Sequence, residues 1–306
     1  GIRYLYDYPT FMKDGYEMAS RKLFNFSPFM YKIRENRTGV KFRETFREVC
    51  DTMQGIWSRD AKARAPFIYM EEVTKEPKFP TDYSNTIVDS NGVYTIKKGY
   101  LDTPKLIRID ENGEEHLLSH LQYATSGLQL HDGRLYWSED KPDERWSLKN
   151  NSWIRSIRPE GKKKKNVTGK DDLLYNPSFS GEKMATTRYF PEGGSALYID
   201  GQTIMAPDSL QIVETAWIGD IVYATAVSDK GFGIYSYDGM WEVILNPEPV
   251  KVCDFKAHGD ELAFICDRTG VNELYHFDPV SGDLRQIALV IILMRAGLSL
   301  NLADLK

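Results

Sequence analysis

The sequence predicts a mainly β fold, a β-propeller of about five four-stranded blades, either as such or as part of a six-bladed propeller, preceded by a small helical segment. Two patterns alternate along the chain, and each returns after about 40 residues. One pattern is an apolar strand, a turn with glycine and a second apolar strand. The other is an alternating strand that usually ends in Asp and a tight turn. Two hairpins per repeat make a four-stranded blade, and blades stacked around an axis bury each other's faces.

The first pattern is a hairpin that occurs five times. Its turn glycine supplies the positive φ that a tight turn requires. The five copies cover residues 87–94, 128–136, 177–185, 216–223 and 255–264, with turn glycines Gly92, Gly133, Gly181, Gly219 and Gly259.

The second pattern follows each first one after about 20 residues. Its Asp is expected to cap the turn through the side chain. A β-sandwich is the alternative fold, but it predicts turns about every 8 to 12 residues and no longer self-similarity. The copies cover residues 106–113, 154–161, 196–201, 234–239 and 274–279, so both patterns agree on five blades.

The part of the chain before the repeats is expected to be different. Residues 1–65 form a helical segment, because Phe11–Phe24 and Phe42–Trp57 carry apolar residues at helical spacing. Residues 66–81 contain several prolines and are interpreted as a linker. The propeller is expected to cover residues 82–288.

Residues 289–306 are an apolar tail that breaks the repeat. The tail is too short and too charged to predict a membrane span, so membrane association stays open. We expect a strand or a short helix that packs on the propeller.

Composition excludes some classes of partner. The formal charge of −5 and a pI near 5.7 argue against a nucleic-acid partner, which favours a basic surface. Three cysteines give no disulfide framework. Cys253 and Cys266 are expected on neighbouring strands, and two buried free thiols are favoured over a bridge.

The sequence contains no complete catalytic, cofactor or metal motif, so no catalytic residue, cofactor or metal ligand is predicted. His116 and His120 lack the intervening Glu of the zinc helix motif. On the expected strand they lie about 13 Å apart, too far for one metal ion. Asp110–Gly113 has the composition of half a calcium loop and is interpreted as a plain turn.

A binding surface is predicted on the longest irregular stretch of the repeats, Glu139–Trp153. Arg and Trp are typical anchors of interfaces. In the alternative interpretation the Trp side chains pack between blades. The predicted binding residues are Trp137, Arg145, Trp146 and Trp153.

The hairpin Pro177–Ala185 resembles the P-S-F-S-x-D-G-K-x-I-A hairpin of TolB-like, WD-type propellers, with a shortened turn and no Asp. The copy His258–Phe264 is similar, with His in the place of the Asp. The resemblance covers residues 82–288 and implies the propeller fold but no particular function.

Two shorter stretches resemble other proteins. Thr38–Trp57 is similar to the junction where a gluzincin peptidase domain of exported bacterial proteins runs into such a propeller. That resemblance implies an upstream zinc peptidase-like domain and a periplasmic or cell-envelope location, although H-E-x-x-H has no match here. Leu284–Lys306 is similar to an early transmembrane helix of cation/proton antiporters.

The sequence therefore predicts a non-catalytic propeller that binds a protein or peptide, as part of a larger exported bacterial protein. One alternative is an accessory domain of a zinc metallopeptidase whose catalytic domain lies upstream. The other is a carbohydrate-active propeller enzyme, whose paired carboxylates sequence cannot identify among 44 Asp and Glu residues.

Overall fold

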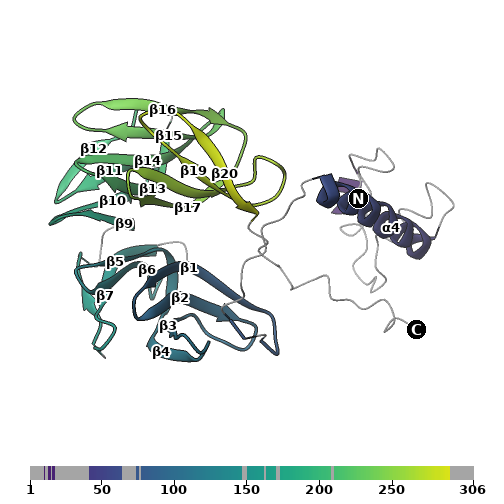
Figure 1. Ribbon diagram of the computed structural model, residues 1–306, viewed down its shortest axis with the longest axis horizontal. Coiled ribbons are helices and arrows are strands. Elements are labelled where there is room, and N and C mark those ends of the chain that lie inside the picture. The colour runs from purple at the N-terminus through teal and green to yellow at the C-terminus, as the bar shows by residue number, and fades with distance from the viewer. Residues whose placement is uncertain are drawn as a thin grey trace. The chain divides into compact units, whose positions relative to one another are not determined.

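The computed structural model divides into two compact units, residues 1–67 and 68–306. In the first unit, helix α4 spans Phe42–Ala63 (Figure 1), so the helix predicted at Phe42–Trp57 is confirmed and extends further. Most of the helix predicted at Phe11–Phe24 lies outside the described residues. The structure describes residues 10, 13–14, 16–17, 41–63, 74–75, 77–146, 150–161, 163–169, 173–207 and 210–289.

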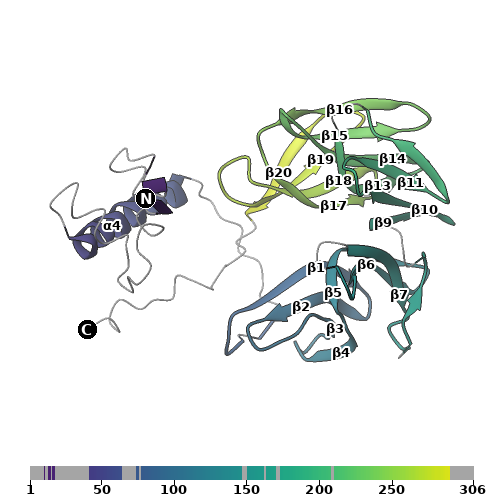
Figure 2. The same cartoon turned by 180° about the vertical axis from the view of Figure 1, so that it is seen from behind.

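The second unit confirms the propeller of five four-stranded antiparallel blades, which follow one another along the chain (Figures 1 and 2). Blade 1 contains β1 (Thr81–Asp89), β2 (Gly92–Gly99), β3 (Lys105–Ile109) and β4 (Glu115–His120). Blade 2 contains β5 (Tyr123–His131), β6 (Arg134–Pro142), β7 (Asn150–Ile157) and β8 (Lys165–Asn166). Blade 3 contains β9 (Leu174–Ser180), β10 (Lys183–Tyr189), β11 (Ser195–Ile199) and β12 (Gln202–Met205). Blade 4 contains β13 (Gln211–Ile218), β14 (Ile221–Ser228), β15 (Gly231–Tyr237) and β16 (Trp241–Glu248). Blade 5 contains β17 (Val252–His258), β18 (Glu261–Cys266), β19 (Glu273–Phe277) and β20 (Leu284–Leu289).

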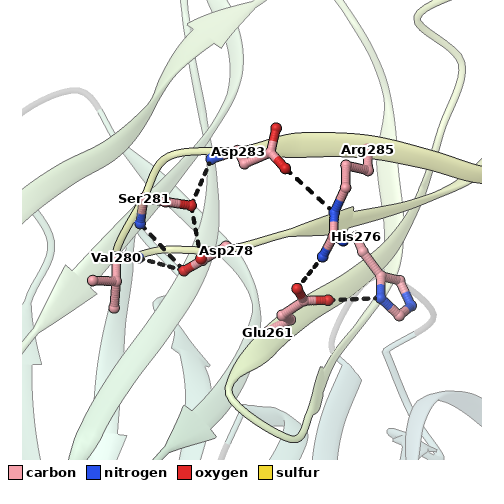
Figure 3. Close-up of polar contacts among 7 residues, drawn as sticks. All are labelled: Glu261, His276, Asp278, Val280, Ser281, Asp283 and Arg285. Carbon is pink, nitrogen blue, oxygen red and sulfur yellow. Dashed lines mark hydrogen bonds and ion pairs between the residues drawn. The ribbon is translucent and has the colours of Figure 1, made fainter.

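The glycine turns of the first pattern are confirmed, and the Asp cap of the second pattern is present at Asp110 and Asp278. All five glycines of the first pattern have positive φ, from 55° at Gly181 to 129° at Gly92. In the second pattern, Asp278 Oδ1 accepts the backbone N–H of Val280 at 2.8 Å, and Asp278 Oδ2 accepts the Ser281 hydroxyl at 2.7 Å. Figure 3 shows this capped turn at the end of blade 5.

A charged contact joins the three outer strands of blade 5 beside that turn. Glu261 on β18 accepts from His276 Nδ1 on β19 at 3.0 Å and also contacts the Arg285 guanidinium on β20 (Figure 3). Arg285 Nε lies 3.4 Å from Asp283. Because these side chains are partly exposed, the contact is expected to contribute little to stability.

The core is divided among the contacts between neighbouring blades. Apolar clusters join blades 1 and 2, blades 3 and 4, and blades 4 and 5. Val222–Ala226 on β14 is buried without interruption, because blade 4 packs on both faces. On β18 burial alternates: Leu262 and Phe264 face blade 4, whereas Ala263 is half-buried on the other face.

Cys253 and Cys266 are free thiols on the neighbouring strands β17 and β18, as predicted. Cys266 is buried and Cys253 is half-buried. Cys253 pairs with Ile265 and Cys266 pairs with Val252, so the two cysteines are not opposite each other. Burial raises the pKa of the Cys253 thiol to about 11, which disfavours the reactive thiolate.

The innermost strand of every blade is interrupted by a shift of register, as in a β-bulge. Four of the five strands have a left-handed residue there: Asn85 at φ 54°, Gly127 at 76°, Asn176 at 52° and Asp254 at 54°. Asn, Asp and Gly tolerate this conformation best. Glu214 occupies the same position in β13, four residues before the end of the strand.

Gly127→Ala is expected to destabilise the propeller strongly. The added Cβ would lie 2.6 Å from the Asn176 Cα, in a backbone already at positive φ. The combined clash and strain predict a loss of roughly 2–4 kcal/mol in the free energy of unfolding, measured by urea denaturation. Gly181→Ala is the matched control, because its φ is +55° but nothing lies within 4 Å. Its expected cost is about 1 kcal/mol. Equal losses in the two variants would show that the close approach at the axis is unimportant.

Candidate functional site

Hydrogen bonds link each blade to the next around the propeller axis. The residues at the bulges of the inner strands make most of them, through side chains or backbone. From blade 1 onward the bonds are Gly127 N–H to Asn85 Oδ1 (3.1 Å), Asn176 N–H to Ser138 Oγ (3.5 Å), Asn176 Nδ2 to Val213 O (2.5 Å), Phe255 N–H to Glu214 Oε2 (3.1 Å) and, from blade 5 to blade 1, Lys256 Nζ to Thr86 O (2.9 Å).

Two of these axial groups are electrostatically perturbed. Burial, with a contribution from the nearby Asp254 carboxylate, raises the pKa of Glu214 to about 7. Burial also lowers the pKa of Lys256, while the charges of Asp254 and Glu214 act in the opposite direction. The Glu214 carboxyl therefore retains its proton to a much higher pH than an ordinary glutamate, and its Oε2 accepts the Phe255 N–H.

The axial cavity is too small for an organic ligand. Its volume is about 10 Å³, roughly the space of a single water molecule. Asn85, Asn176, Glu214 and Asp254 are among the residues that line it. The polar groups at the axis therefore hold the blades together, and a larger partner would have to bind elsewhere.

The structure separates Trp137 from the rest of the predicted binding surface. Trp137 on β6 is fully buried, in the cluster between blades 1 and 2. Its Nε1 donates to Glu139 Oε2 at 3.0 Å, and Arg155 lies 3.3 Å from the other carboxylate oxygen. Trp137 is therefore a core residue, which agrees with the alternative interpretation that Trp side chains pack between blades.

Arg145 and Trp146 lie together on the connection between β6 and β7. Both are exposed, and Trp146 is 64% exposed as a residue. Asp143 Oδ1 accepts the N–H groups of Arg145 (2.9 Å) and Trp146 (3.0 Å), which orders the turn. An open depression of about 680 Å³ is lined by Lys141, Pro142, Asp143, Glu144, Arg145, Trp146 and Asn151.

Trp153 lies on β7 beside this depression and is half-buried. The Arg155 guanidinium lies 4.9 Å from its ring centroid, and Lys141 Nζ lies 5.8 Å away. Lys141 also lines the depression. Trp153 is thus connected to the depression through Lys141, whereas Arg145 and Trp146 line it directly and are exposed.

The histidine pair has the geometry predicted for a strand. His116 and His120 both lie on β4, and His116 Nε2 is 2.8 Å from Asp110 Oδ2. Asp110 Oδ1 accepts the N–H groups of Asn112 and Glu114, so the calcium-like segment is a turn. Within the described ranges, no group of three or more His, Cys, Asp or Glu side chains could hold a metal ion. The helices in those ranges include none long and apolar enough to cross a membrane.

Sequence reasoning missed the axial residues. The signal was present, because Asn85, Gly127, Asn176, Glu214 and Asp254 each stand four residues before the end of their inner strand. Aligning the repeats at that position shows Asn, Gly, Asn, Glu and Asp, four of which are residues that favour left-handed backbone. That composition indicates a bulge, although it does not show which blade each residue contacts.

No protein-family model matches the chain, and no curated protein sequence matches it. A puromycin-hydrolyzing peptidase from Mycobacterium tuberculosis is similar in structure, with TM-score 0.49, 13% identity, and coverage of 68% of this chain and 37% of the peptidase. The propeller domain of the Trilobed protease from Pyrococcus furiosus gives a TM-score of 0.47 and 15% identity, with coverage of 67% of this chain and 68% of the protease domain. An oligogalacturonate lyase gives a TM-score of 0.49 and 13% identity, with coverage of 70% of this chain and 66% of the lyase. The chain thus spans little more than a third of the first of these proteins.

The resemblances to TolB-like propellers and to gluzincin peptidases remain predictions. The antiporter-like stretch from residue 290 onward lies outside the described residues, as does nearly all of the apolar tail.

Glu214 is expected to make stability depend on pH between about 4.5 and 7. The unfolded chain ionises Glu near its ordinary pKa of 4.5, whereas the folded protein keeps the proton up to about 7. The native state therefore binds more protons in this window, and stability falls as pH rises through it. At about 1.36 kcal/mol per pKa unit, the free energy of unfolding is expected to fall by on the order of 2–3 kcal/mol between pH 4.5 and 7.

Glu214→Gln retains an acceptor for the Phe255 N–H and removes the titration. Urea denaturation from pH 4.5 to 8 should show a flatter stability profile and a more stable protein at pH 8 than wild type. Glu192→Gln is the control at an exposed position and should leave the profile unchanged. A Glu214→Gln profile that parallels wild type would contradict this assignment.

Proposed function

We propose that this chain is a non-catalytic binding propeller within a larger protein, and that Arg145 and Trp146 anchor a protein or peptide partner. The observation that carries the proposal is the large, 64% exposed Trp146 side chain on an ordered turn. Trp and Arg are the residue types most enriched among binding hot spots. An exposed indole loses contact with water when a partner covers it, which favours association.

The surroundings of Trp146 support a peptide-sized partner. The depression of about 680 Å³ has the dimensions of ordinary ligand sites. The exposed Arg145 side chain supplies a positive charge that a partner's carboxylate can meet. A partner that combines an apolar or aromatic residue with an acidic one fits this arrangement. The axis, with room for about one water, is too narrow to take such a partner.

Selection from a displayed peptide library on the full chain tests this proposal. For peptides so obtained, Trp146→Ala is expected to weaken binding by at least about tenfold, since hot-spot residues contribute about 2 kcal/mol or more. Arg145→Ala should weaken binding to peptides with an acidic residue and spare those without one. Affinities would be measured by titration calorimetry.

Tyr100→Ala is the matched control, because Tyr100 is an 83% exposed aromatic residue on a different connection. It should bind like wild type. Peptides whose affinity depends on Tyr100 and not on Trp146 would overturn the assignment of the surface. Glycan cleavage by the purified chain would overturn the non-catalytic function.

A further inference from the structure

A row of three polar side chains crosses blade 1 near its outer turns. Tyr94 on β2 pairs directly with Arg108 on β3, and Arg108 pairs directly with His116 on β4. Directly opposed residues in antiparallel strands project from the same face, about 5 Å apart at Cβ. Tyr94 belongs to the cluster between blades 1 and 2, so the row faces blade 2.

Two atoms of this row are buried without a partner. The Tyr94 side chain is fully buried, and in the described part of the chain neither its hydroxyl nor Arg108 Nε has a hydrogen-bond partner. The Asn91 amide lies beside the Tyr94 hydroxyl and lowers its pKa as a donor does, so it offers no acceptor for the hydroxyl proton. Leaving such groups unsatisfied is costly, so buried polar atoms without partners call for an explanation.

The row lines an open depression of about 400 Å³ between the turns of two blades. Blade 2 contributes Pro159 and Glu160, from the turn after β7. Arg108 and Asn91 also line a second, larger depression of about 820 Å³ on blade 1. A ligand seated on Arg108 would therefore have room to extend to either side.

The charges of the site favour an anion with a single negative charge. Among the described residues, Arg108 forms no ion pair, whereas two carboxylates that line the larger depression with it have other partners: Asp110 holds His116 at 2.8 Å, and Asp89 accepts from Asn91. Glu160 adds a negative charge at the rim, which disfavours a dianion. Burial raises the pKa of Tyr94, so its hydroxyl remains a donor at neutral pH.

We propose that Tyr94 and Arg108 form a carboxylate-binding site between blades 1 and 2, independent of the surface at Trp146. The planar guanidinium matches a carboxylate geometrically, since two parallel N–H groups can reach its two oxygens. The Tyr94 hydroxyl supplies a further donor from the buried side. A free small carboxylate or the C-terminal carboxylate of a peptide would meet these donors in the same way.

Calorimetric titration of the full chain with four probes tests the site. The probes are acetate, N-acetyl-Ala-Ala with a free carboxylate, its C-terminal amide, and inorganic phosphate. Acetate and the peptide acid are expected to bind and to compete with each other, while the amide does not bind. Tighter binding of the peptide acid would identify a peptide terminus as the source, and equal binding would identify small carboxylates.

Variants distinguish recognition from structure. Arg108→Gln should abolish carboxylate binding, and Tyr94→Phe should weaken it about tenfold, since a hydrogen bond to a charged group is lost. Without ligand, Tyr94→Phe should leave the melting temperature unchanged or raise it, because its hydroxyl has no partner. Arg188→Gln is the control, because Arg188 donates to Thr203 Oγ1 at 3.0 Å in blade 3 and should not affect binding.

Three results would overturn the proposal. The first is equal binding of the peptide acid and its amide, or no binding of either carboxylate. The second is tighter binding of phosphate than of carboxylate. The third is a fall in the melting temperature of ligand-free Tyr94→Phe, which would show that the hydroxyl has a structural partner.

Discussion

The close approach of the five inner strands is the constraint on which the rest of the propeller depends. At their bulges these strands come near enough for Asn85, Asn176, Glu214 and Lys256 to bond the neighbouring blade. Gly127 is required for the same reason, since a Cβ there would meet the backbone of Asn176. Apolar faces supply most of the driving force for stacking blades. Because this force is non-directional, it does not by itself prevent one blade from sliding against the next. The directional bonds at the axis fix how each blade is placed against the next.

The sequence was sufficient for the blades because their information is local. A glycine such as Gly133 and an Asp such as Asp278 specify a turn through their own backbone and side-chain chemistry, and alternation specifies the strands on either side. The axial bonds are different in kind. Glu214 and Phe255 lie 41 residues apart, and their contact exists only after two blades have packed. The sequence of a single repeat therefore indicates where the bulge lies, but it does not indicate which residue of the neighbouring blade the bulge residue contacts.

The same distinction explains why residues predicted to form one binding surface lie in different environments. Trp137 and Trp146 are near each other in sequence, but Trp137 lies within β6, on the face that packs against blade 1. Glu139 follows two residues later, so its carboxylate lies on the same face and reaches the indole N–H at 3.0 Å. Trp146 comes after β6 has ended at Pro142 and remains exposed. Residue type alone did not separate a core tryptophan from a surface one.

The antiparallel order of the strands places the two proposed sites at opposite ends of blade 2. Glu160 lies in the turn from β7 to β8, whereas Arg145 and Trp146 lie in the connection from β6 to β7. Successive connections in a four-stranded antiparallel sheet alternate between its two ends. In blade 1, the turn at Asn91 joins β1 to β2 and the turn at Asp110 joins β3 to β4. Both turns therefore lie at the end of the blade that corresponds to the Glu160 end of blade 2. The axial cavity between the two ends has a volume of only about 10 Å³. A carboxylate at Arg108 and a peptide at Trp146 would therefore occupy separate surfaces, and binding at one should leave affinity at the other unchanged.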